Sequence, residues 1–142
     1  MKPTLLLRIA SVLTIVHAGL HTIGGVLSKP DPGAAATAFA AMQSNHFLVM
    51  GLSRTYADFY RGLGVAISIF LTAEGIVFWQ LGSLARTEAY RLRPILATFL
   101  IAYLAVAVNS YESIFQVPVV VEVLIGICLG LAIFSAKPAI VN

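Results

Sequence analysis

The sequence predicts an all-α fold, an integral membrane four-helix bundle with an extra short helical segment in its first outer loop. Of the 142 residues, 59% are hydrophobic and only 11% are charged, whereas soluble domains carry about 25% charged residues. A membrane helix needs about 20 mostly apolar residues, and the chain supplies four such windows. This composition excludes a soluble enzyme, a disordered tail and a nucleic-acid-binding domain.

Four spans and one long loop account for the chain, which we expect to form a single membrane domain over residues 1–142. The spans are predicted at residues 5–27, 56–81, 94–111 and 118–136, with an outer loop at 28–55. The windows 9–28 and 94–111 contain no charged residue, and the windows 62–85 and 113–136 contain only Glu74 and Glu122, respectively.

The basic residues predict the orientation of the spans. One side holds Lys2, Arg8, Arg86, Arg91, Arg93 and Lys137, and the other side holds Lys29, Arg54 and Arg61. Loops rich in Lys and Arg stay in the cytoplasm. We therefore expect both termini and residues 86–93 to be cytoplasmic. The net charge of +3 is scattered, so it does not indicate a polyanion partner.

The first span has a competing interpretation as a cleaved signal peptide, because Lys2 and Arg8 precede an apolar run. The run is long, contains two histidines and lacks a clean small-x-small cleavage site, so we expect it to be retained. It should end near Leu27, because the prolines and glycine of residues 29–33 stop a helix.

The outer loop is expected to contain a short helix over residues 34–51, lying at the outer surface or dipping into it. Its polar centre, residues 43–46, makes it poorly suited to crossing lipid. Residues 55–58, Thr-Tyr-Ala-Asp, match a capping box and predict where the second span begins. Pro94 and Pro118 suit the first turns of the third and fourth spans, with an inner loop at 86–93.

Polar side chains inside spans usually face the bundle interior, because lipid offers no hydrogen bonds. His17 and His21 lie four residues apart on one face of the first span, in a stripe with Ser11, Thr14, Ala18, Gly25 and Ser28. The pair lacks the intervening Glu of the metalloprotease motif, and no other span offers a second haem ligand. Structural hydrogen bonding, proton transfer or ligand binding, and metal binding remain alternatives. We predict no metal and no cofactor.

Glu74 lies near the middle of the second span, where a carboxyl group needs a partner or stays protonated. Helical periodicity places five large side chains near its face: Tyr56, Tyr60, Ile67, Phe70 and Phe78. This arrangement predicts a carboxyl group in an aromatic-lined cavity. A neutral carboxyl that serves helix packing is the alternative.

The third span carries a small and polar stripe, and we expect its Asn109 to face inward. The stripe consists of Thr98, Ala102, Ala105, Asn109 and Ser113. For Glu112 and Glu122, an explanation without a functional role is available. Glu112 lies at the outer boundary, where it can be solvated, and Glu122 lies near a helix N-terminus, whose dipole favours a carboxylate. Gly126 and Gly130 predict close helix packing.

The deduced orientation places His17 and Glu74 near mid-membrane and the remaining polar groups closer to the outer face. The candidates for contacting a ligand in one outward polar cavity are Asn109, Tyr60, Glu112, Glu122, His46, Arg54, Asp58 and Arg61. Arg54 and Arg61 are explained equally well by pairing with Asp58, Glu112 or Glu122, by attracting an anionic head group, or by simple solvation.

Short motifs resemble the DoxX-like small bacterial membrane proteins. They are Leu5-Leu6-Leu7-Arg8-Ile9-Ala10, Ala18-Gly19, Gly24-Gly25, Glu74-Gly75, Leu81-Gly82 and Arg86. The resemblance covers two of the four spans and implies a four-helix bundle of variable function in a bacterial inner membrane. The histidine pair and the long loop at 44–61 depart from that pattern. The acidic and aromatic cavity is also similar to that of the emopamil-binding and sigma-2-receptor group, whose helices enclose sterol-like ligands.

Together these features predict a membrane protein that binds a small lipophilic substrate. Acid/base chemistry of the isomerase, cyclase or hydratase type would suit an isoprenoid-like or aromatic molecule, with Glu74 as the acid and His17 or His21 as the base or proton relay. Asn109 and Tyr60 would orient the substrate. The alternative is a non-catalytic accessory or homo-oligomeric subunit, and a proton-coupled carrier is a third possibility. Membrane lipid is an expected partner and nucleic acid is not.

Overall fold

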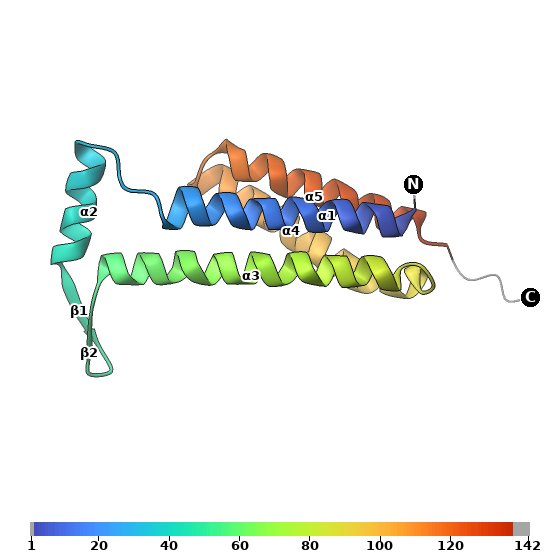
Figure 1. Ribbon diagram of the computed structural model, residues 1–142, viewed down its shortest axis with the longest axis horizontal. Helices are drawn as coiled ribbons and strands as arrows, with labels where there is room; N and C mark the ends of the chain where they lie inside the picture. The colour runs from blue at the N-terminus through green and yellow to red at the C-terminus, as the bar shows by residue number, and fades with distance from the viewer. Residues whose placement is uncertain (1, 138–142) are drawn as a thin grey trace, which may run out of the picture. The chain divides into compact units, whose positions relative to one another are not determined.

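The computed structural model describes residues 2–137, and this part of the chain is mostly helical. Its elements are α1 (Pro3–Leu20), a π-helical segment η1 (His21–Val26), α2 (Ala34–Ser44), β1 (His46–Val49), β2 (Leu52–Thr55), α3 (Tyr56–Leu84), a 3₁₀ segment η2 (Ala89–Leu92), α4 (Arg93–Ser113) and α5 (Gln116–Ser135) (Figure 1). Within the described residues, four helices are long and apolar enough to cross a membrane by length and composition. The predicted helical class and the four long apolar segments are confirmed at this level.

The capping box and the first proline that were predicted to begin helices lie at the starts of α3 and α4. The Asp58 backbone N–H donates to Thr55 Oγ1, and the Thr55 N–H donates to Asp58 Oδ2, both at 3.0 Å, so the capping box starts α3. Pro94 lies in the first turn of α4, where its missing N–H costs no hydrogen bond. The first helical segment ends at Val26, before the predicted stop at residues 29–33.

The outer loop departs from the prediction after Ser44. The predicted helix over 34–51 is wrong for its second half, which forms an antiparallel hairpin pairing His46 with Thr55 and Val49 with Leu52. Met50 and Gly51 connect the strands with φ of 49° and 80°. Two successive residues with positive φ match a type I′ turn, whose twist suits a two-residue hairpin. The apolar run after Asn45 therefore belongs to a strand.

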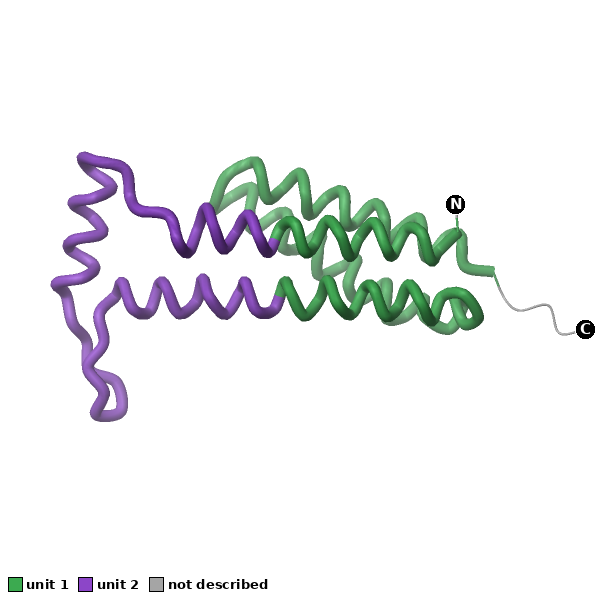
Figure 2. Tube along the Cα trace, in the orientation of Figure 1, with its two compact units in different colours: residues 1–17, 71–142 green, residues 18–70 purple. Residues whose placement is uncertain are grey.

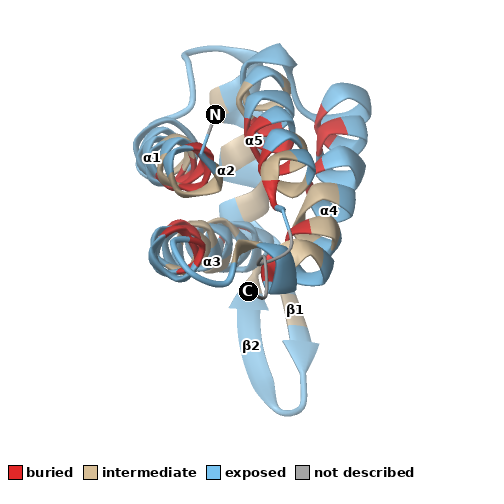
Figure 3. Cartoon of the chain, turned by 90° about the vertical axis from the view of Figure 1, so that its right-hand side faces the viewer, coloured by how far each residue is buried: buried red, intermediate tan, exposed pale blue. Residues whose placement is uncertain are grey.

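The chain divides into two compact units, coloured separately in Figure 2. Unit 1 comprises residues 1–17 and 71–142, and unit 2 comprises residues 18–70. In unit 1, side chains from α1, α3, α4 and α5 form one apolar cluster around Phe78, Leu96, Ile125 and Leu129, each at most 1% exposed. Figure 3 shows the buried positions as bands along one side of these helices.

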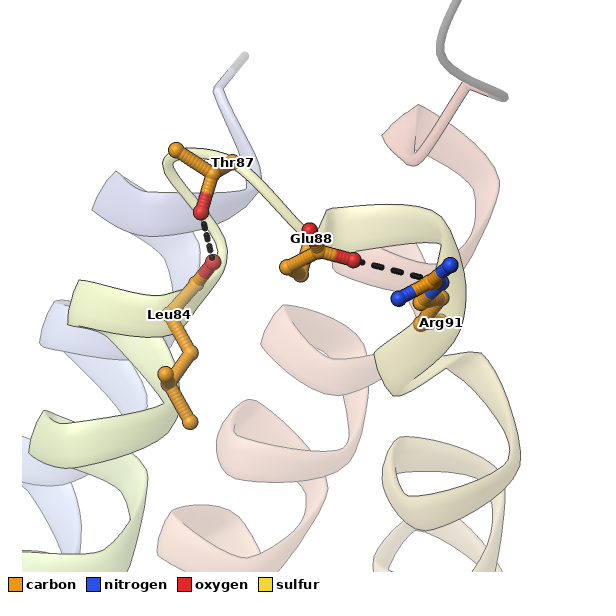
Figure 4. A network of polar contacts seen from close by, with 4 residues as sticks. All are labelled: Leu84, Thr87, Glu88 and Arg91. Carbon is orange, nitrogen blue, oxygen red and sulfur yellow. Dashed lines mark hydrogen bonds and ion pairs between the residues drawn. The ribbon is translucent and has the colours of Figure 1, made fainter.

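Polar contacts also tie the turn between α3 and η2 in unit 1 (Figure 4). The Thr87 hydroxyl lies 3.5 Å from the Leu84 carbonyl oxygen, and Arg91 Nε lies 3.3 Å from Glu88 Oε2. The ion pair is exposed, so it contributes little to stability.

Small residues bring α1 and α3 together within unit 1. Ser11 Oγ donates a 2.6 Å hydrogen bond to the Gly75 carbonyl oxygen. Gly82 follows Gly75 by seven residues on α3 and also lies against α1. A Cβ at Gly82 would stand 3.4 Å from the Thr4 carbonyl oxygen. Thr4 and Ser11 are also seven residues apart. Small side chains at this spacing allow two helix backbones to approach closely.

Gly126 and Gly130 lie at a helix contact, as predicted, but this contact does not depend on their being glycine. A Cβ at these positions would stand 3.7 and 4.0 Å from the Leu100 side chain, which is ordinary contact. The contact between α5 and α4 therefore has room for a methyl group at either glycine. The tight glycine is Gly75, where a Cβ would lie 2.6 Å from Ile15 Cδ1.

We therefore expect Gly75→Ala to lower the melting temperature in mild detergent more than Gly126→Ala. At Gly75 the Ile15 side chain must move, and the Ile15 backbone nitrogen at 3.4 Å limits how far the helices can adjust. Overpacking of this kind costs about 1–3 kcal/mol. Thermal unfolding followed by circular dichroism measures both variants, and equal melting temperatures would contradict the prediction.

Candidate functional site

Three helices of unit 1 contribute to a chain of hydrogen-bonding groups centred on Tyr103. Tyr103 Oη of α4 lies 3.0 Å from Glu74 Oε2 of α3 and 3.2 Å from Thr14 Oγ1 of α1. Thr14 Oγ1 in turn donates to the Ala10 carbonyl oxygen at 2.9 Å. Tyr103 is 5% exposed and Thr14 is fully buried, so this chain connects Glu74 to the interior of the unit.

Aromatic rings surround the inner end of this chain. The fully buried Phe78 ring packs edge-on against Phe99 with centroids 5.0 Å apart, and its centroid lies 6.1 Å from that of Tyr103. The predicted aromatic environment of Glu74 is thus partly correct. Phe78 belongs to it, but its other rings come from α4. Tyr60 and Phe70 are 61% and 74% exposed.

The donors of this chain are the two hydroxyl groups. Tyr103 Oη donates to Glu74 Oε2, and Thr14 Oγ1 donates to the Ala10 carbonyl oxygen. Either hydroxyl group could donate in the contact between Tyr103 and Thr14. Glu74 thus accepts from Tyr103 through one of its two oxygens.

Glu74 is only half-buried, unlike Tyr103. Its second oxygen, Oε1, makes no hydrogen bond with any residue from 2 to 137. The carboxyl group is therefore fixed on one oxygen and open on the other. A site of this kind can accept a hydrogen bond from a hydroxyl or amine that reaches it from outside.

A second buried carboxyl group joins α4 and α5. Ser110 Oγ donates to Glu122 Oε1 at 2.9 Å, and the two residues are 1% and 3% exposed. Glu122 Oε2 is buried without a hydrogen-bond partner in the part of the chain that the structure describes. Glu122 is thus an interior group of unit 1.

The buried face of α4 differs from the predicted stripe. Its buried residues are Leu96, Tyr103, Ala107 and Ser110, whereas Thr98, Ala102, Ala105, Asn109 and Ser113 are all exposed. The expectation that Asn109 faces inward is therefore wrong. Because α4 is apolar nearly all round, its hydrophobic pattern does not mark one face. Tyr103 and Ser110, which the sequence reasoning missed, are seven residues apart on the true interior face.

The two predicted histidines have different local settings. His21 opens η1 in unit 2, and its Nε2 lies 3.1 Å from the Gly64 carbonyl oxygen, to which it donates in the Nε2–H tautomer. Beside it, the Thr22 hydroxyl donates to Ser68 Oγ at 2.9 Å. His17 is half-buried in unit 1. Among residues 2–137, no group of three His, Cys, Asp or Glu side chains could hold a metal ion.

The remaining predicted ligand contacts lie on exposed parts of the chain. His46 Nδ1 is 3.4 Å from Ser53 Oγ in the hairpin, and Arg54 donates to the neighbouring Ser53 carbonyl at 2.9 Å. Asp58 caps α3. The last two, Arg61 and Glu112, are exposed. Within residues 2–137, neither Arg54 nor Arg61 forms an ion pair.

Unit 1 also carries an apolar groove between α1 and α3, with a volume of about 360 Å³. It is lined by Ser11, Val12, Ile15, Val16, Gly75, Ile76 and Trp79. Ser11 directs its hydroxyl to the Gly75 carbonyl, so the floor of the groove has no free polar group on these two residues. This groove contains none of the polar residues that the sequence singled out for ligand binding.

Comparisons with protein families, characterised proteins and solved structures found no match to this chain.

The buried Ser110–Glu122 contact predicts a selective loss of stability in Ser110→Ala. Removing the hydroxyl leaves Glu122 Oε1 buried without its donor, which costs about 1–3 kcal/mol. The matched control is Ser113→Ala, an exposed position on the same helix. Thermal unfolding in detergent should show a lower melting temperature for Ser110→Ala alone.

The double variant Ser110→Ala/Glu122→Leu should recover most of this loss, because it removes both partners. A double variant less stable than Ser110→Ala would contradict the assignment.

Proposed function

We propose that this chain is an integral membrane protein with four spans that binds a small lipophilic molecule bearing a hydrogen-bond donor. The four long apolar helices support membrane insertion. The excess of Lys and Arg near the chain ends and in residues 86–93 supports cytoplasmic termini, and the inner membrane of a bacterium suits this arrangement.

Glu74 is the observation that carries the binding proposal. An ionisable side chain within a span is costly and usually functional. Tyr103 holds Glu74 Oε2, while Oε1 has no partner among residues 2–137 and the side chain is half-buried. A ligand hydroxyl or amine would satisfy that oxygen, and the lipophilic remainder of the ligand would stay in the apolar phase.

Acid/base chemistry at the same carboxyl group extends this proposal. A tyrosine hydroxyl donates to a carboxylate and accepts from a carboxylic acid, so Tyr103 supports Glu74 in both states. A neighbouring hydroxyl group that can both donate and accept suits a catalytic acid, which releases and regains a proton. Isomerisation, cyclisation or hydration of an isoprenoid-like or aromatic substrate would use it, with His17 of the same unit as the proposed base or relay.

Mass spectrometry of small molecules that co-purify with the protein tests the binding proposal. We expect a lipophilic compound in extracts of the unmodified protein and at least a tenfold smaller amount with Glu74→Gln. An amide oxygen that accepts from Tyr103 leaves an NH2 group in place of Oε1, and this group cannot accept a hydrogen bond. The control is Glu88→Gln, an exposed carboxylate in the turn before α4. Equal amounts of the compound in both variants would remove Glu74 from the binding site.

A second candidate function, association with another copy of this chain, is favoured by the exposed face of α4. Asn109 is exposed in an apolar helix and makes no hydrogen bond with residues 2–137. Amide side chains in membrane helices hydrogen-bond across helix contacts. This side of α4 also carries Ala102 and Ala105. Their spacings of three and four residues from one another and from Asn109 place all three residues on one continuous stripe of the helix.

Crosslinking in mild detergent distinguishes this second candidate. Asn109→Leu should reduce the crosslinked dimer several-fold, whereas Gln80→Leu, an exposed amide on α3, should not. A protein that stays monomeric without either substitution excludes it.

A further inference from the structure

We propose that the groove between α1 and α3 binds an anionic phospholipid, with its phosphate at Arg8 and one acyl chain along the groove. The inference requires membrane insertion and does not depend on the role proposed for Glu74. All the residues involved belong to unit 1.

Arg8 lies next to the groove, against one of its lining residues. Its guanidinium carbon lies 3.5 Å from the centre of the Trp79 ring, and Trp79 lines the groove. Arg8 Nη2 donates to Ser83 Oγ at 3.2 Å, which is its one hydrogen bond to another side chain in the described chain. Two contacts thus fix the guanidinium group in place, and no carboxylate within residues 2–137 neutralises it.

The position of Arg8 suits a lipid head group. It lies in the second turn of α1, and Trp79 lies in the last two turns of α3. Arginine near a helix end reaches toward the membrane surface, where tryptophan is also enriched. A guanidinium group binds phosphate oxygens through paired N–H donors, and basic sites between membrane helices bind anionic head groups.

The remainder of the groove suits an acyl chain. Val12, Ile15 and Val16 of α1 are each at least 41% exposed and face the groove together with Ile76 of α3. From Arg8 to Val16, α1 rises about 12 Å. The hydrogen bond from Ser11 to Gly75 leaves this length of the groove apolar. Charge at one end and an apolar channel along the rest match the two parts of a phospholipid.

Native mass spectrometry of delipidated protein, titrated with phosphatidylglycerol or phosphatidylcholine, tests the proposal. We expect one phosphatidylglycerol to be retained in preference to phosphatidylcholine. Arg8→Ala should reduce that preference at least fivefold, and Arg8→Lys should keep part of it because the charge remains. Arg86→Ala is the matched control, since it removes one exposed charge from the turn after α3.

Filling the groove tests the acyl site independently of folding effects at Arg8. Val12→Phe enlarges an exposed groove residue and should lower retention of both lipids at least threefold, whereas Val108→Phe, equally exposed on α4, should not. Equal losses in Arg8→Ala and Arg86→Ala, or unchanged retention in Val12→Phe, would overturn the proposal. Glu74→Gln should leave lipid retention unchanged, so the failure of either proposal can be recognised separately.

Discussion

The structure depends on how the polar groups of apolar helices find partners inside the protein. Lipid supplies no hydrogen bonds, so each such group must be satisfied by the chain or by a bound molecule. The contact from Ser11 to Gly75 shows how this is achieved between helices, since a small donor and a glycine carbonyl let α1 and α3 approach. Tyr103 and Ser110 extend the same solution to Glu74 and Glu122, two carboxyl groups within apolar stretches of unit 1.

The two carboxyl groups are used differently. Glu122 is 3% exposed and lies inside the contact between α4 and α5. Glu74 is held through Tyr103 but remains half-buried, with one oxygen uncommitted among the described residues. Because both are single acidic residues in apolar windows, residue type alone could not separate a packing group from a candidate ligand contact. The difference comes from which neighbouring helix supplies a hydroxyl group.

Features with a local physical cause could be predicted from the sequence. The capping box at Thr55, the first-turn proline of α4 and the four apolar windows each depend on residues close in the chain. The hairpin after Asn45 is not predicted, because its second strand, Leu52–Thr55, is mostly polar and the polar residues 43–46 fit the centre of a surface helix. The interior face of α4 depends on partners in other helices, and an evenly apolar helix carries no signal for it.

The wide turn in the first helical segment explains one further mismatch and has a consequence for helical-wheel prediction. Ser11, Thr14 and Ala18 are buried as one stripe, but Gly25 and Ser28, counted forward on the same helical period, are exposed. The π-helical segment His21–Val26 turns less per residue than an α-helix, so residues beyond it face different directions from those that an α-helical count gives. A helical wheel that runs unbroken from Ser11 to Ser28 therefore assigns Gly25 and Ser28 to a face that they do not occupy.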